Sequence, residues 1–270
     1  MRAPQSESPY QEVEFPRIRE GAIDLLREAH RKHMIHALLE IDVTDARRRI
    51  REHKAQTAET LSFTAFIAAC LAKAVDEDKA MHAYRRGKRK LVVFDEVDVN
   101  IMVERQVVGN RMGTPNIIRV ANKKSLRQIH DQIRAAQAGA VEDTRGMEWF
   151  RWAPLAARLP VWLRTLAWRA MQRDPHTLKR MAGTVGITAV GMFGLGAGWG
   201  LTIPFLTLNV VLGGIAEKSA LVSGRIETRE LLCVTISVDH DIVDGAPAAR
   251  FASRFKDLIE SSYGLTEAME

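Results

Sequence analysis

The sequence has little of what marks a disulfide-rich, secreted or membrane-spanning protein. Its 270 residues include two cysteines, Cys70 and Cys233, which lie far apart and outside any C-x-x-C pair. We therefore expect no disulfide scaffold, a cytoplasmic location, and a core position for Cys233. No apolar run reaches the roughly 18–20 residues that span a bilayer. Residues 1–14 lack the apolar core of a secretory signal and are predicted to form a flexible arm.

Motifs for metal, nucleotide and nucleic-acid binding are also missing from the sequence. It has no H-E-x-x-H, no Walker motif and no G-x-G-x-x-G register. Residues His30, His33 and His36 cannot all share one helix face, so we expect no metal site. Zinc-finger spacing, an RNP-like aromatic string and basic-zipper heptads are absent, which argues against a nucleic-acid partner.

What is present is a basic charge balance. The chain carries 39 Lys and Arg against 33 Asp and Glu, a net charge of +6. Such a balance favours anionic partners, for example a membrane surface or a phosphorylated cofactor. Two basic clusters, at residues 47–51 and 85–90, are interpreted as solvated surface.

The hydrophobic pattern predicts one α+β domain with a mixed sheet, because strands and helices follow each other without strict alternation. We assign this domain to residues 15–265 and a short tail to residues 266–270. Thr44 and Ser62 are predicted helix N-caps, and residues 90–93 and 97–103 are predicted to pair as a hairpin. The helices are expected at 21–33, 45–53, 63–75, 125–136 and 246–261, and the other strands at 37–43, 184–190, 206–211 and 232–238.

Residues 147–181 form a segment rich in tryptophan and arginine. It holds four of the five tryptophans, and Pro160 and Pro175 bracket a predicted helix of about four turns. Three interpretations are open: a helical pair packed on a subunit assembly, a lid or partner-docking surface, or a helix lying in a membrane interface. We favour the first, and expect no membrane partner.

The segment most indicative of chemistry is residues 237–246, SVDHDIVDGA, at the end of one predicted strand and the start of a helix. Catalytic side chains favour such a position, because the scaffold is rigid and the loop is exposed. His240 can exchange a proton near neutral pH, and either Asp239 or Asp244 could orient it. Gly245 permits a turn there.

This segment resembles a known signature. Residues 239–245 match the D-H-x-x-x-D-G of the dihydrolipoyl acyltransferase components of 2-oxo acid dehydrogenase complexes, and the related chloramphenicol acetyltransferases carry a similar H-x-x-x-D-G. Four further segments are similar to the family in the same order along the chain. They are residues 15–19 (FPRIR), 40–44 (EIDVT), 122–129 (NKKSLRQI) and 183–194 (GTVGITAVGMFG).

The resemblance implies a chloramphenicol acetyltransferase-like trimer, with mixed sheets flanked by helices and active sites between subunits. It also implies that an acyl group moves between coenzyme A (or acyl-CoA) as substrate and a thiol of the lipoyl type. His240 would take the thiol proton, Thr188 would hold the oxyanion where the family has a serine, and Asp244 would support the histidine loop. Expected partners are a lipoyl carrier protein or decarboxylase subunits, with no metal and no covalent lipoyl group on this chain.

The sequence also departs from the family. Asp241 stands where an arginine is usual, Gly186 replaces a threonine, and residues 147–181 read as an insertion. The glycine-rich run 191–200 is expected to let the backbone approach pantetheine or a neighbouring subunit. Because Glu267 and Glu270 charge the tail, we expect a plain trimer. Two alternatives stay open: a non-catalytic acyl-CoA-binding or scaffolding homologue, and an acyltransferase for a small-molecule hydroxyl or amine.

Overall fold

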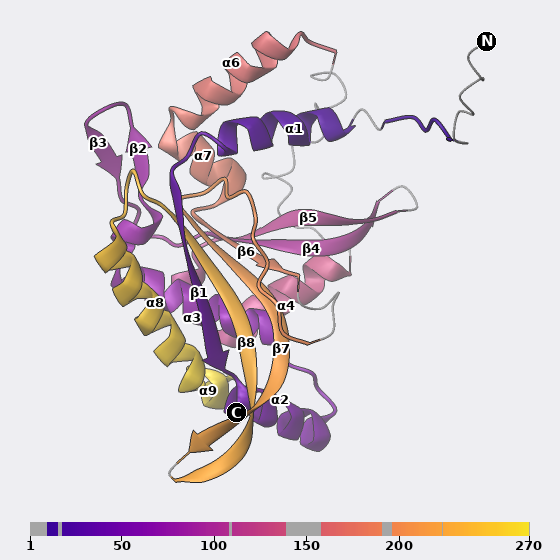
Figure 1. Ribbon diagram of the computed structural model, residues 1–270, viewed down its shortest axis with the longest axis vertical. Helices are drawn as coiled ribbons and strands as arrows, with labels where there is room; N and C mark the ends of the chain where they lie inside the picture. Colours follow the sequence, from indigo (N-terminus) through magenta and orange to yellow (C-terminus); the bar gives the residue numbers. More distant parts are fainter. Residues whose placement is uncertain are drawn as a thin grey trace, which may run out of the picture.

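The computed structural model describes residues 10–15, 18–107, 110–138, 158–190, 196–222 and 224–269 (Figure 1). Within these ranges a six-stranded sheet has the order β1-β8-β7-β6-β4-β5, and β4–β6 and β6–β7 are its parallel pairs. The mixed sheet expected from the sequence is thus confirmed. Its strands are β1 (Met34–Asp42), β4 (Val99–Val107), β5 (Asn110–Ile118), β6 (Val185–Ala189), β7 (Leu208–Val222) and β8 (Arg225–Asp239); β2 (Tyr84–Arg86) and β3 (Lys90–Val92) form a separate hairpin.

The helices begin largely where the sequence signals predict. Ser62 caps α3 by accepting a hydrogen bond from the Ala65 amide, and Ser125 forms a capping box with Gln128 at the start of α4. Pro160 directly precedes α6 and Pro175 opens α7, as expected from proline's fixed backbone angle. The helices are α1 (Ile18–Ala29), α2 (Thr44–Thr57), α3 (Phe63–Glu77), α4 (Leu126–Gln137), α6 (Val161–Gln172), α7 (Pro175–Ala182), α8 (Gly245–Glu260) and α9 (Leu265–Met269).

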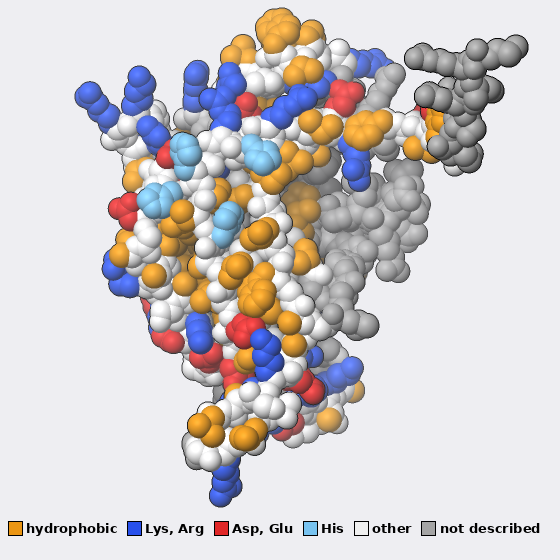
Figure 2. All heavy atoms as spheres, in the orientation of Figure 1, with side chains coloured by type: hydrophobic (Ala, Val, Ile, Leu, Met, Phe, Trp, Pro, Cys, Tyr) orange, Lys and Arg blue, Asp and Glu red, His pale blue; other side chains and the backbone are white. Residues whose placement is uncertain are grey.

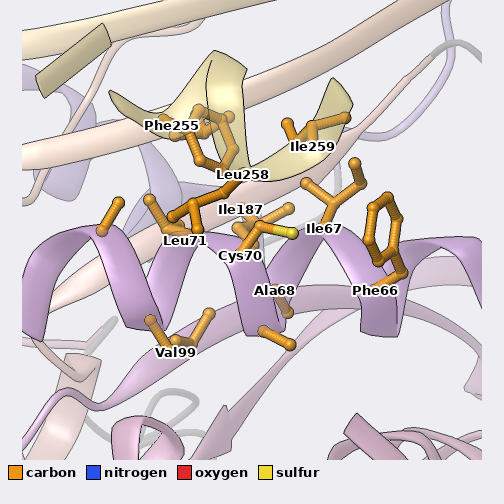
Figure 3. Close-up of a cluster of buried hydrophobic side chains, with 14 of the residues drawn as sticks. Phe66, Ile67, Ala68, Cys70, Leu71, Val99, Ile187, Phe255, Leu258 and Ile259 are labelled. Atoms are coloured by element: carbon orange, nitrogen blue, oxygen red, sulfur yellow. The ribbon is translucent and has the colours of Figure 1, made fainter. Parts of the chain in front are cut away.

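One face of the sheet packs against helices and forms the core. The apolar helix α3 contributes Phe66, Cys70 and Leu71, which meet Phe255 of α8 and Ile187 of β6 (Figure 3). Cys233 of β8 is also buried, and both cysteines are free. The predicted core position of Cys233 is therefore confirmed. None of the described helices is long and apolar enough to cross a bilayer.

The opposite face, which we call the open face, is partly exposed. Strand alternation directs Leu38 of β1 and Met102 of β4 to it, and both are exposed to solvent. The loop around residues 196–203 crosses this face, and the Trp199 indole donates to the Leu39 carbonyl on the edge strand β1. Figure 2 shows hydrophobic side chains gathered near histidines on the side of the molecule where β1 and β8 lie.

The described part of the glycine-rich run packs on this chain's own sheet. The Gly214 amide donates to the Gly198 carbonyl at 2.9 Å. A side chain on Gly213 or Gly214 would collide with the carbonyl oxygens of Gly198 and Gly196. The absence of side chains at these glycines therefore allows the loop backbone to pack closely against β7. Residues 191–195 lie outside the described ranges.

Two sequence predictions of local structure are wrong, and some elements differ in extent. The strand at residues 90–92 pairs with residues 84–86 through a turn at Gly87, which has φ +66°, and not with residues 97–103. Thr44 is inside α2, where the Asp42 carboxylate accepts from its amide and hydroxyl at 3.0 and 2.6 Å. The predicted strands at 206–211 and 232–238 fall in the buried halves of the longer strands β7 and β8, whose outer halves are largely exposed. The tail is helical as α9.

Candidate functional site

The predicted histidine lies on a turn whose backbone is fixed from several directions. His240 directly follows β8, and its amide donates to the His33 carbonyl at 2.7 Å. The Asp239 amide donates to the Thr207 carbonyl, and the Asp239 carbonyl accepts from the Ile242 and Val243 amides. The His240 side chain remains exposed. The turn thus holds an accessible imidazole on a rigid base, as a proton-transfer group requires.

The two aspartates beside His240 make different contacts. Asp239 is buried, and its carboxylate accepts from Lys32 Nζ at 2.6 Å. Asp241 is exposed and bonds the His33 ring nitrogen Nδ1 at 2.9 Å, with Arg85 Nη1 at 3.7 Å. Neither contact involves the His240 ring. The acid at the position of the family's usual arginine therefore ties the turn to β1 and to the β2–β3 hairpin.

Asp244 begins the helix that follows the turn. It is the N-cap residue of α8, and its carbonyl accepts from the Ala248 amide at 3.1 Å. Its carboxylate is exposed and has no hydrogen bond or ion pair within the described part of the chain. An aspartate at this position still favours the helix through the helix dipole.

Thr188 lies on the open face of β6, half-buried, and far from His240 in the same chain. The register places Thr188 opposite Val211 of β7, which is opposite Thr235 of β8. His240 follows Thr235 by five residues, which is about 16 Å along the strands, and two strand spacings add about 10 Å sideways. The two side chains are therefore about 19 Å apart. One chain does not bring the predicted base and oxyanion donor together.

The glycine that replaces the family's threonine makes room for an asparagine. A side chain at Gly186 would meet the Asn209 Oδ1 atom at 2.7 Å. Asn209 in turn donates to the Leu206 carbonyl at 2.9 Å. The Asn209 side-chain amide thus covers the open face at this position, two residues before Thr188.

A cavity of about 210 Å³ adjoins the histidine turn. Tyr84 is buried there and donates to the Gly183 carbonyl at 2.5 Å, and burial raises its pKa well above the usual range. It therefore stays protonated and structural. One side-chain nitrogen on the wall, Nε2 of Gln172 in α6, is buried and has no partner among the described residues. The wall consists of Glu28, Arg31, Lys32, Tyr84, Arg85, Gln172, Leu178, Phe205, Thr207, Asp239, Asp241 and Ile242.

Sequence reasoning missed Lys32, His33 and Arg85 as the partners of the histidine turn. Histidines 30, 33 and 36 were considered only as metal ligands, yet His33 bonds Asp241 and His36 bonds the Ser237 hydroxyl at 2.8 Å. Lys32 and His33 lie about 200 positions from the turn, and the antiparallel pairing of β1 with β8 brings them close; Arg85 comes from the separate β2–β3 hairpin. No local sequence signal indicates that pairing.

Comparison with known proteins identifies the family. The sequence profile described as 2-oxoacid dehydrogenases acyltransferase (catalytic domain) matches residues 7–148 and 161–266. The dihydrolipoyllysine-residue acetyltransferase component of the pyruvate dehydrogenase complex of Rickettsia conorii is 24% identical over 201 residues. The match covers 74% of this chain and 40% of that protein, so the chain spans less than half the length of this relative.

Two solved structures share the fold. The cubic core of a pyruvate dehydrogenase multienzyme complex has a TM-score of 0.69 at 16% identity, with 98% of this chain and 99% of that chain covered. Azotobacter vinelandii dihydrolipoamide acetyltransferase also gives 0.69 at 16% identity, covering 96% and 94%. The study of that enzyme concerns the roles of a serine, a histidine and an asparagine in its catalytic mechanism, the asparagine four positions after the histidine.

Proposed function

This chain belongs to the family of 2-oxoacid dehydrogenase acyltransferase catalytic domains, and on that premise we propose that it is a coenzyme A-dependent acyltransferase. It moves an acyl group between acyl-CoA and a thiol acceptor of the lipoyl type. His240 is the general base, Thr188 is the oxyanion donor, and Asp244 supports the histidine turn. The lipoyl group is carried by another protein or domain, and decarboxylase subunits are the expected partners in a complex.

The chemistry needs one proton acceptor and one hydrogen-bond donor. The acceptor thiol gives its proton to His240, since only a thiolate attacks efficiently. The sulfur then bonds to the thioester carbonyl carbon, and the resulting oxyanion accepts a hydrogen bond from the Thr188 hydroxyl. When the bond to the coenzyme A sulfur breaks, the imidazolium returns the proton to that sulfur. Charge and atoms balance without a further reactant.

The observation that carries the proposal is the exposed imidazole on its anchored turn after β8. Asp244 follows His240 by four positions, as the asparagine follows the histidine in the Azotobacter enzyme. The separation of about 19 Å from Thr188 supports a site shared between two copies, because both groups must lie about 3 Å from one reacting thioester. We therefore include a homotrimer in the proposal.

A thioester-exchange assay with acetyl-CoA and dihydrolipoamide tests the function. His240→Ala should lower turnover by roughly 10²–10⁴, while the matched control His30→Ala, also an exposed histidine, should not. Thr188→Val should lower turnover by roughly 10²–10³ with coenzyme A affinity retained, and Thr188→Ser should be tolerated.

The same assay separates the alternatives. Coenzyme A binding without exchange, in wild type and variants alike, would indicate a non-catalytic binding or scaffolding homologue. Transfer to small-molecule hydroxyls or amines but not to dihydrolipoamide would indicate an acyltransferase for small molecules. Full activity of a folded His240→Ala variant would refute the assignment of the base.

A further inference from the structure

Helix α6 exposes apolar side chains on its outer side, while one of its arginines is turned inward. A surface helix normally buries its apolar stripe and exposes its charges. In α6 the Arg164 side chain is only 9% exposed, whereas Trp162 is 68% and Leu166 is 53% exposed. At 100° per residue, Arg164 points nearly opposite to Trp162. No residue of α6 is fully buried.

The inward position of Arg164 is held by ion pairs to α1. Arg164 donates to Asp24 through Nε and to Glu20 through Nη1, both at 2.7 Å. Asp24 is only 2% exposed, so this contact is one that water does not screen well. Arg169 adds a contact to the largely buried Glu28 at 3.3 Å. The acids of α1 are thus occupied beneath α6, and the charge that remains on the outside is positive.

The outer surface of α6 combines exposed apolar side chains with arginines. Leu159 and Val161 are exposed beside Trp162 and Leu166. The stretch 158–173 contains four arginines and no Asp or Glu. The nearby β2–β3 hairpin, which α7 contacts through β2, exposes Arg86, Lys88, Arg89 and Lys90. Figure 2 shows these hydrophobic and basic side chains together at one end of the molecule.

We propose that this end docks on an anionic phospholipid surface. We call it the α6 face, defined by the exposed apolar residues Leu159, Val161, Trp162 and Leu166 with Arg158 and Arg173. Tryptophan and leucine enter the boundary between headgroups and acyl chains, while arginines pair with lipid phosphates. The sequence alone led us to expect no membrane partner, and the exposed apolar and basic side chains of the α6 face are the reason to depart from that expectation.

The charge and position of the α6 face favour a bilayer over a protein as its binding partner. A second copy, with a net charge of +6, has few unpaired acids to set against these arginines. Helix α6 is an outermost helix at one end of the molecule, where an extended flat surface can reach its exposed side chains (Figure 1). A basic, outward-facing helix with an exposed tryptophan suits a flat anionic surface.

Docking would also bring the cavity beside the histidine turn close to the lipid. Gln172 is the last residue of α6 and lines that cavity, and Leu178 of α7 lines it as well. The helix that meets the lipid therefore also forms part of the cavity wall. The proposal of membrane attachment does not depend on the proposed acyltransferase activity, because vesicle binding is measured without any acyl transfer.

The experiment is co-sedimentation of the full chain with vesicles of phosphatidylcholine alone or mixed with phosphatidylglycerol. We expect binding to the anionic vesicles only, weakened by salt. Trp162→Ala with Leu166→Ala should weaken binding at least tenfold. Arg158→Gln with Arg173→Gln should weaken it by roughly tenfold or more. The matched control is Leu221→Ala with Ile226→Ala, an exposed apolar pair at the tip of the β7–β8 hairpin.

Circular dichroism first establishes that each variant is folded, and Trp162→Phe with Leu166→Met keeps the apolar character and should retain binding. Failure of the wild-type chain to bind anionic vesicles would overturn the proposal. So would equal loss of binding in the hairpin control. Self-association that disappears in the Trp162 and Leu166 variant would assign the α6 face to a second copy, and binding to polyglutamate but not vesicles would assign it to an acidic protein.

Discussion

Mixing two inactive variants should restore activity if the site lies between subunits. His240 and Thr188 are about 19 Å apart in one chain, so each site must take the imidazole from one copy and the hydroxyl from another. His240→Ala lacks the base at every site of its own trimer. Thr188→Val lacks the oxyanion donor at every site of its own trimer. A mixed trimer contains sites at which both groups are intact.

The size of the recovery follows from the arrangement. In a closed ring of three each site pairs one copy with the next, so every mixed trimer, whether two-to-one or one-to-two, has one site in three with both intact groups. Activity of the mixed trimers should therefore return to about a third of wild type, whereas each variant alone retains about 10⁻² or less. The activities expected for the mixed trimers and for each variant alone differ by more than tenfold, which exceeds ordinary kinetic error.

The assay uses co-expressed variants with different affinity tags, purified through both tags in succession. Exchange between acetyl-CoA and dihydrolipoamide is then measured at a fixed chain concentration. The control mixes the two purified homotrimers without co-expression, and it should stay at the low level until subunits exchange. Mixed trimers no more active than the separate variants would refute a shared site, provided that both variants co-purify.

Three further outcomes are expected. Burial lowers the pKa of His82 to about 4. Between this value and the unfolded value of about 6.5 mainly the unfolded chain binds the proton, so the free energy of unfolding should fall by about 3 kcal/mol as the pH drops to about 4. In urea titrations His82→Gln should flatten that fall. Lys32→Met leaves the buried Asp239 carboxylate unpaired and should cost about 3 kcal/mol in urea unfolding, unlike the exposed control Lys54→Met. Leu265 of α9 is buried in its own chain, so light scattering should give three times 30.2 kDa, and a stable larger assembly at low concentration would contradict this.

Local signals in the sequence were enough to predict most helices and the position of the histidine. Ser62 and Ser125 mark helix starts because their hydroxyls satisfy free backbone amides, a requirement that depends on only a few neighbouring residues. The apolar character of α3 likewise predicts a buried helix from its own residues. The turn after β8 follows from a β-branched strand followed by Asp and Gly.

Strand pairing could not be predicted in the same way. The strand at residues 90–92 has the alternation of a hairpin, but alternation does not identify the partner. The outer halves of β7 and β8 are largely exposed and mix charged residues with Leu221 and Ile226, so they lack the period-two pattern that marks a half-buried strand. The Asn209 side chain that occupies the space over Gly186 is likewise invisible from the sequence, because it belongs to the neighbouring strand.

The orientation of α6 shows why composition alone could not decide among the interpretations of the Trp/Arg-rich segment. An arginine on an apolar helix is compatible with an inner or an outer position, and only its partners decide which one is stable. Here Glu20 and Asp24 of α1 hold Arg164 inward, and that contact turns Trp162 outward. The acids of α1 thus control the surface that the molecule presents, although none of them lies on it.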